Sequence, residues 1–436
     1  MGDIWWYFFD LIRYFNISQS DNGCATACHL MQSRAALSAP LESREPVRRC
    51  VARHCGRSIS VTPNSDWDIL QTFRPVADVT TTSADYDRYL ALSDLLACQH
   101  PVAPNQGRTA HDEMLFIIVH QVYELWFKQI LHELDRIEEL FAATTVAEAT
   151  LPDVVRGFER VVAILKIGVQ QLDVLETMTP LDFLDFRDLL STASGFQSLQ
   201  FRLIEARLGL AESRRLLFDT KAAAERLSDR DRERLARERK RTTVLAALDA
   251  WLARTPFVSM GDFTFDRTYR AAIDVMLDRE TARVRAEIGL EPERSRQEIA
   301  ALENARDAFG SIFVDSPADS VWNMSARSIR AALFIMLYRD QPALQSPFRL
   351  LAALMDIDET LTMWRHRHAL MAERMIGVKT GTGGSSGHVY LRRAADQHRI
   401  FIDLFRLSTY LIPRSAIPPL PESIERQMRF VYMAAS

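Results

Sequence analysis

The stretch DEMLFIIVHQVYELWFKQILHELDRIEELF, residues 112–141, decides the fold. Its apolar side chains recur every three or four positions, as at Phe116, Tyr123, Phe127 and Leu134. This period is typical of a helix that buries one face and leaves the other in water. The stretch therefore predicts one long amphipathic helix, of a length that suits a helical bundle.

The same period extends outward along most of the chain. Beyond a break at 150–152 it predicts further helices at 153–178, 194–210, 244–254, 292–310, 327–339 and 347–377. The highly charged segment 222–244 alternates in sign, which favours a solvated helix or hairpin. Strand-like alternation is scarce, and the sequence has no repeat of fixed period. We predict an all-α, long-helix bundle over residues 79–436, preceded by an N-terminal extension of unknown role, residues 1–78.

The composition narrows the class of partner. Of the 436 residues, 47% are hydrophobic and 25% are charged, which is ordinary for a globular protein with a large core. The net charge is −4, without a basic excess or a long block of one sign. We therefore expect a small molecule or a protein as partner, and no nucleic acid.

Four of the five cysteines lie in the N-terminal extension, at Cys24, Cys28, Cys50 and Cys55. This uneven distribution favours a reducing compartment over a disulfide-stapled secreted protein. The string CATACH resembles a covalent haem attachment site, but that motif has two residues between its cysteines, not three. A zinc site built from these cysteines with His29 or His54 is a second interpretation, although the compact spacing of such sites is absent.

The first sixteen residues, MGDIWWYFFDLIRYFN, are aromatic and apolar. The apolar run is shorter than the roughly 20 residues that cross a bilayer. It also lacks the basic start and the small-residue cleavage site of a signal peptide. An interfacial amphipathic segment and a mis-assigned translation start both remain open. We expect no membrane-spanning segment.

His120 is the first candidate for chemistry. Phe116 lies one turn before it, and Tyr123 and Glu124 lie one turn after it, so these side chains share a helix face. The alternative is a core histidine satisfied by one hydrogen bond. A di-iron carboxylate site needs Glu-x-x-His pairs on two helices, and the His–Glu order and spacing here do not match.

The string WRHRHALMAERM offers two more histidines. His366 and His368 are two positions apart and point about 200° away from each other on a helix, so only one can face the interior. Trp364, one turn before His368, can pack on the same side. An inward imidazole beside an aromatic ring suits a proximal haem ligand. A buried structural histidine is the alternative.

Arg187 lies in LDFLDFRDLLSTASGFQSLQFR, between Phe183 and Phe186 on one side and Leu190 on the other. A guanidinium near an apolar wall requires an anion, and its planar fork suits a carboxylate. Neighbouring aspartates of the chain could supply that carboxylate instead: Asp182, Asp185 and Asp188.

The stretch GVKTGTGGSSGHVYLRR, residues 377–393, concentrates glycine in a chain that has only sixteen. Glycines let backbone amides approach a ligand closely. A P-loop would need a lysine after the glycines, but Lys379 precedes them, and the dinucleotide pattern places Ser386 where its last glycine belongs. The loop also follows a helix rather than a strand. We reject a phosphate-binding role.

Four motifs together resemble the tryptophan 2,3-dioxygenase family. They are HDEMLFIIVHQVYELWFKQILHELD, LDFLDFRDLLSTASGFQSLQFR, WRHRH followed by GTGGSSG, and FIDLFRLSTYLIPR, and the resemblance covers roughly residues 84–426. It implies an all-helical, homotetrameric, cytoplasmic enzyme with one haem b per subunit, active as Fe(II). Such an enzyme inserts both atoms of O2 into the indole C2–C3 bond of L-tryptophan and gives N-formyl-L-kynurenine.

The resemblance also implies roles for individual residues around the haem. His368 corresponds to the proximal iron ligand, with Trp364 stacked beside it. His120 corresponds to the distal histidine that accepts a hydrogen bond from the indole N–H, and Phe116 lines the same pocket. Ser194 and Gly195 fall where the family wraps the distal side of the haem.

For the amino-acid part of the substrate, the resemblance implies that Arg187 binds the carboxylate. Thr382 corresponds to the residue that fixes the ammonium and carboxylate groups, so GTGGSSG becomes a clamp and lid. Three residues match a segment that reaches into a neighbouring subunit's site: Tyr86, Tyr89 and Leu90.

Two other functions stay open. A haem-binding sensor without turnover would keep the helices but would not need Arg187 and Thr382. A related indole dioxygenase with a broader substrate range would keep both. Phe183 stands where some family members have tyrosine, a difference of one hydroxyl.

Overall fold

Almost all regular structure in the described part of the chain is helical. The computed structural model describes residues 85–141, 143, 145–190, 197–211, 227–287, 291–313, 322–377 and 387–429, with the backbone alone at 387–390. Within these residues the strands are β1 (Ser259–Met260) and β2 (Phe263–Thr264), which form a short antiparallel hairpin. The all-α prediction is confirmed.

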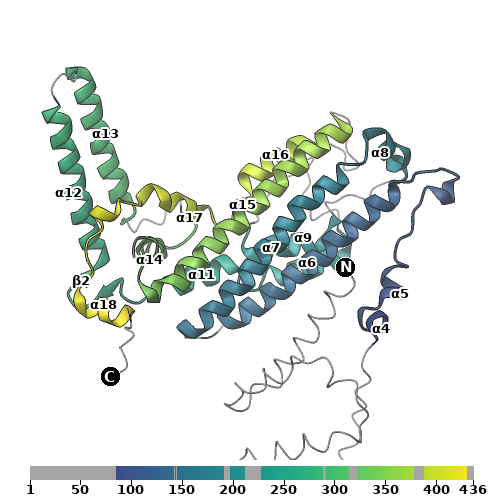
Figure 1. Ribbon diagram of the computed structural model, residues 1–436, viewed down its shortest axis with the longest axis horizontal. Coiled ribbons are helices and arrows are strands. Elements are labelled where there is room, and N and C mark those ends of the chain that lie inside the picture. Colours follow the sequence, from purple (N-terminus) through teal and green to yellow (C-terminus); the bar gives the residue numbers. More distant parts are fainter. Residues whose placement is uncertain are drawn as a thin grey trace, which may run out of the picture. The chain divides into compact units, whose positions relative to one another are not determined.

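Three long helices form the framework: α6 (Glu113–Phe141), α7 (Leu151–Leu175) and α15 (Pro342–Ile376). They run side by side, with α7 packed against both α6 and α15 (Figure 1). The predicted stripe of α6 is buried at Tyr123 and Phe127. Residues 113–141 therefore form the helix that their apolar period predicts.

The longest helix, α15, begins five residues before the predicted position. Pro342 occupies its first turn, where proline's fixed φ and missing N–H are tolerated. Pro347, taken as the start in the sequence, lies inside the helix and is buried. At this position it removes one intrahelical hydrogen bond without ending the helix.

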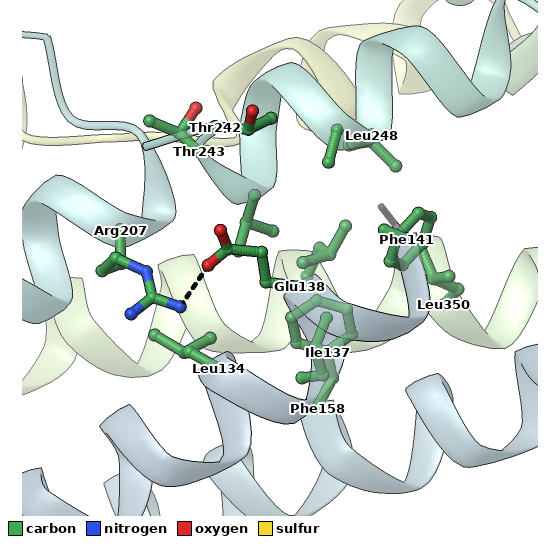
Figure 2. Close-up of a pocket in the computed structure, with 13 residues that line it drawn as sticks. Leu134, Ile137, Glu138, Phe141, Phe158, Arg207, Thr242, Thr243, Leu248 and Leu350 are labelled. Carbon is green, nitrogen blue, oxygen red and sulfur yellow. Dashed lines mark hydrogen bonds and ion pairs between the residues drawn. The ribbon is translucent and has the colours of Figure 1, made fainter. Parts of the chain in front are cut away.

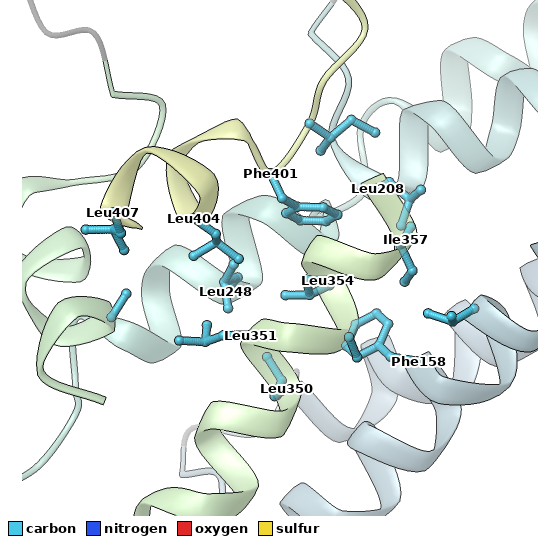
Figure 3. Close-up of a cluster of buried hydrophobic side chains, with 14 of the residues drawn as sticks. Phe158, Leu208, Leu248, Leu350, Leu351, Leu354, Ile357, Phe401, Leu404 and Leu407 are labelled. Carbon is cyan, nitrogen blue, oxygen red and sulfur yellow. The ribbon is translucent and has the colours of Figure 1, made fainter. Parts of the chain in front are cut away.

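The core lies where α7, α15 and the C-terminal segment meet (Figure 3). α17 (Ile402–Arg406) and the residues around it add apolar side chains to those of α7, α11 (Val244–Leu252) and α15. Complete burial of each such side chain is worth roughly 1.5–3 kcal/mol. The central members are Phe158, Leu208, Leu248, Leu350, Leu351, Leu354, Ile357, Phe401, Leu404 and Leu407.

Shorter helices complete the bundle. They are α4 (Tyr86–Leu90), α5 (Leu92–Leu95), α8 (Pro180–Arg187), α9 (Leu199–Leu208), α10 (Asp229–Glu238), α14 (Ala326–Leu337), α16 (Gly387–Gln397) and α18 (Glu422–Met428). Of these, α10 falls in the charged segment and buries only Leu235, as expected for a solvated helix. Among the described residues, no helix is both long enough and apolar enough to cross a membrane.

One long helix was not predicted. α12 (Phe265–Ala286) pairs with α13 (Pro292–Ser311) as two antiparallel helices (Figure 1). The side chains that α12 buries follow a four-residue spacing at Phe265, Tyr269 and Ile273. The remaining surface is rich in arginine and acidic residues, which hid this narrow stripe in the sequence.

Candidate active site

His120 presents a free imidazole nitrogen from α6. Its Nδ1 lies 2.7 Å from the carbonyl oxygen of Phe116. A carbonyl oxygen only accepts, so in the neutral imidazole Nδ1 carries the proton and Nε2 is left as an acceptor. The side chain is exposed, which does not fit a core histidine. Desolvation by the surrounding protein nevertheless lowers the pKa of His120, so the ring is neutral near pH 7.

His368 lies on α15. Burial, with a smaller contribution from the charge of His120, lowers the pKa of His368 to about 4. Its Nδ1 is buried and has no hydrogen-bond partner among the described residues. The ring of Trp364 lies 5.2 Å away, centroid to centroid, at 46°. Two neutral imidazoles, one on α6 and one on α15, therefore lie near enough to interact electrostatically.

His366 points elsewhere, as helical geometry requires. Its side chain is 46% exposed, and its Nε2 lies 3.6 Å from Oδ1 of Asp396 on α16. The prediction that only one histidine of the pair faces the interior is confirmed.

Three phenylalanines form an apolar wall beside His120. The Phe116 ring lies 4.1 Å from the imidazole of His120, centroid to centroid, and 5.9 Å and 5.5 Å from the rings of Phe183 and Phe186. Phe183 and Phe186 meet edge to face at 89°. Such a wall between α6 and α8 can receive a flat aromatic molecule through ring contacts.

Arg187 ends α8, directly after this wall, and is half-buried. Two of the three aspartates that could pair with it have other partners. Asp182 accepts hydrogen bonds from the backbone and side chain of Thr179 in a capping box, which lowers the pKa of its carboxyl. Asp188 lies 2.6 Å from Arg108, which likewise lowers its pKa.

The small cavity shown in Figure 2 lies away from the candidate site. It measures about 20 Å³, lies between α6, α9, α11 and α15, and is lined mainly by apolar side chains such as Leu134. Arg207 at its edge pairs with Glu138 at 2.6 Å. Leu134 is fourteen residues beyond His120 on α6, roughly 21 Å along the helix axis. This cavity has room for about one water molecule and takes no part in the candidate site.

Comparison with known proteins identifies the family. Residues 71–411 match the family model described as tryptophan 2,3-dioxygenase. The chain is 47% identical over 352 residues to the tryptophan 2,3-dioxygenase of Bdellovibrio bacteriovorus, an alignment that covers 80% of this chain and 98% of that protein. The chain belongs to the tryptophan 2,3-dioxygenase family.

Relatives of the same name occur in distant organisms. The tryptophan 2,3-dioxygenase of Alteromonas mediterranea is 42% identical, with 79% of this chain and 97% of that protein covered. The tryptophan 2,3-dioxygenase of Xenopus tropicalis is 41% identical, with 80% and 86% covered. The resemblance seen in four motifs therefore extends over most of the chain.

Of the other residues that the family resemblance singles out, three lie on an exposed helix and three lie outside the described residues. Tyr86, Tyr89 and Leu90 lie on α4 with exposed side chains. Ser194, Gly195 and Thr382 lie outside the described residues, as do the four N-terminal cysteines. Within the described residues no three His, Cys, Asp or Glu side chains gather into a site for a bare metal ion.

Sequence reasoning missed a buried ion pair next to the tryptophan 2,3-dioxygenase motif WRHRH. Arg365, between Trp364 and His366, is buried and donates to Oε1 of Glu205 at 3.1 Å. It also donates to the carbonyl oxygen of His398 at 3.2 Å. This pair holds α9 against α15. Glu205, a charged residue within the apolar run of α9, was a signal of a buried charge. Nothing in the sequence identifies its partner.

Proposed function

We propose that the protein cleaves the indole C2–C3 bond of L-tryptophan with O2 and gives N-formyl-L-kynurenine. Both oxygen atoms enter the product, so no external reductant is consumed in each turnover. The observation that carries the proposal is a pair of neutral imidazoles, His120 and His368, that interact electrostatically, with an aromatic wall beside His120. Family membership and a substrate with a flat indole ring fit this arrangement.

His368 suits a haem, here a b-type haem in each subunit. No group of three His, Cys, Asp or Glu side chains forms around its imidazole among the described residues, and a porphyrin would supply the other donors to the iron. Because Nδ1 is buried, Nε2 is the nitrogen that would bind the iron. Trp364 would stack beside it, and Ser194 and Gly195 would wrap the opposite side. When bound, a ferrous haem supplies the site that binds and activates O2.

The other residues hold the substrate. Phe116 lines the pocket of the indole ring, and Nε2 of His120 accepts a hydrogen bond from the indole N–H. Arg187 binds the carboxylate through its planar fork. Thr382 meets the ammonium and carboxylate groups from the glycine-rich loop. A zwitterion held in this way places the C2–C3 bond in a fixed orientation, which is the main task of the protein groups.

His120 acts as an acceptor rather than a strong base. The indole N–H is a weak acid, and the pKa of His120 is lowered, so proton removal by this imidazole is unfavourable. Its Nδ1–H is fixed by the carbonyl of Phe116, which directs Nε2 into the site. The proton therefore stays on the indole nitrogen while the ring is oriented.

We further propose a cytoplasmic homotetramer. Apolar side chains are exposed on α6, at Ile118 and Leu125, and on α7, at Ile167 and Val174. Exposed apolar side chains at a seven-residue spacing on each helix favour a protein interface. In such an assembly the exposed Tyr86, Tyr89 and Leu90 of one subunit would complete the site of a neighbour. The concentration of cysteines outside the helical domain agrees with a reducing compartment.

A substrate comparison tests the reaction. L-tryptophan, D-tryptophan and tryptamine are each added to the reduced, aerated protein, and near-ultraviolet absorbance of the formylkynurenine type is followed together with O2 consumption. We expect L-tryptophan to consume one O2 for each product and to react fastest. Similar rates for all three would favour an indole dioxygenase of broader range, and no turnover of any would favour a haem sensor.

Replacing His120 by serine is expected to lower kcat/KM for L-tryptophan about tenfold, because one hydrogen bond to the substrate is lost, and to leave measurable turnover. Steady-state kinetics with the haem content held equal measures this. His366→Ser is the matched control, because that histidine is exposed and points to Asp396, and it should leave kcat/KM unchanged. A loss beyond about a thousandfold with normal substrate binding would make His120 an essential base.

A further inference from the structure

The orientation of His368 has an unusual origin. A metal-ligating histidine normally donates its second ring N–H to a carboxylate or carbonyl, which fixes the ring. Here Nδ1 is buried, and no described residue offers it a hydrogen bond. Orientation must therefore come from packing, and the aromatic side chain in contact is Trp364, with its ring centroid 5.2 Å away.

Trp364 is itself held by groups on two other helices. Its Nε1 lies 3.3 Å from Oη of Tyr123 on α6, at the long end of the hydrogen-bond range. The indole N–H only donates, so the tyrosine oxygen accepts. The ring of Phe201 on α9 lies 5.2 Å from the Trp364 ring, at 41°. These contacts leave the indole little freedom to turn away from His368.

Tyr123 is fixed in turn by α7. Its hydroxyl donates to the carbonyl oxygen of Gly168 at 2.6 Å, and the side chain is 8% exposed. A Cβ at position 168 would lie 3.4 Å from Cε1 of Tyr123, an ordinary van der Waals contact, so the ring packs closely beside this residue of α7. Trp364 thus donates a hydrogen bond to Tyr123, and Tyr123 donates one to the backbone of Gly168.

We propose that Tyr123 is a positioning residue that acts through Trp364 to fix the His368 imidazole, in place of a hydrogen bond to Nδ1. The inference rests on the proposed function, in which His368 binds the haem iron. The Tyr123 hydroxyl thus acts on the iron ligand from α6, the helix that also carries His120.

Tyr123→Phe tests this role, because it removes only the hydroxyl. Tyr338→Phe is the matched control: Tyr338 is 7% exposed, and its hydroxyl also donates to a backbone carbonyl, that of Pro418, at 2.8 Å. In the ferrous haem-loaded protein, we expect Tyr123→Phe alone to shift and broaden the iron–histidine stretching band in resonance Raman spectra. We also expect it to release haem to excess apomyoglobin about fivefold to tenfold faster.

A double variant separates positioning from general destabilisation. Phenylalanine at position 364 has no N–H to leave unpaired, so Tyr123→Phe should add little further effect in a Trp364→Phe background. Equal behaviour of Tyr123→Phe and Tyr338→Phe in both measurements, or fully additive effects in the double variant, would overturn the proposal.

Failure of the haem assignment would look different. If the unmodified chain takes up no haem, the proposed function fails, and the positioning contact is read in the apoprotein. The indole N–H signal of Trp364 in nitrogen-15 NMR spectra, identified by its loss in Trp364→Phe, should shift in Tyr123→Phe and stay in place in Tyr338→Phe. An unmoved signal in Tyr123→Phe would show that the tyrosine does not hold the indole.

Discussion

His368→Ala is expected to abolish the Soret absorption of the purified protein, the largest effect of any single substitution. The proposed function makes the imidazole the protein ligand of the iron, and alanine removes it and leaves a void beside Trp364. Absorbance spectra and the haem content of protein purified under identical conditions measure the result. Imidazole added to the variant should restore part of the absorption, because a free ligand can enter the void.

The matched control is His366→Ala. This histidine belongs to the same turn of α15 but is exposed and faces Asp396, so its loss should leave the haem content unchanged. A thermal melt of both variants checks that each remains folded. Full haem content in a folded His368→Ala variant would show that another side chain ligates the iron.

The sequence predicts helices best where one face is buried deeply and broadly. α6 and α7 show this clearly, because each has apolar residues at nearly every position of one face. α12 is strongly charged and has a narrower stripe of buried side chains. Its partner α13 has no buried residue. Phe265 of α12 packs against the rings of Phe334 and Tyr338, and the local sequence carries no information about these partners.

Helix boundaries were less predictable than helices. Pro347 reads as a helix start in the sequence, since proline is disfavoured in helix interiors. In the structure it lies in the second turn of α15 and is buried against the core. Tertiary packing offsets the loss of one hydrogen bond, and a local rule contains no information about that packing.

For the site, sequence periodicity assigns side chains to faces but does not pair them. It predicts correctly that His366 and His368 point apart, because both lie on one helix. It gives no sign that Tyr123 binds the backbone of Gly168, 45 positions away, or that Arg108 engages Asp188. Such pairings depend on how helices pack, and a carboxylate or hydroxyl has several possible partners until the packing is known.

Arg187 determines the second large effect, which concerns substrate selectivity. A charge-assisted hydrogen bond to a carboxylate is worth about 1.5–3 kcal/mol, and more if either partner is left buried and unpaired. Each 1.4 kcal/mol changes kcat/KM about tenfold. Tryptamine lacks the carboxylate, so its kcat/KM should be at least about tenfold below that of L-tryptophan.

Arg187→Ala should erase most of that preference, and it should do so by impairing the better substrate. We expect kcat/KM for L-tryptophan to fall about 10- to 150-fold, which corresponds to the loss of one charge-assisted hydrogen bond. The value for tryptamine should stay nearly unchanged, and it serves as the control for folding and haem content. Arg187→Lys should recover only part of the loss, because an ammonium cannot form the planar two-point contact. Equal turnover of tryptamine and L-tryptophan by the unmodified enzyme would mean that Arg187 serves only a structural ion pair, and the carboxylate would then need a different partner.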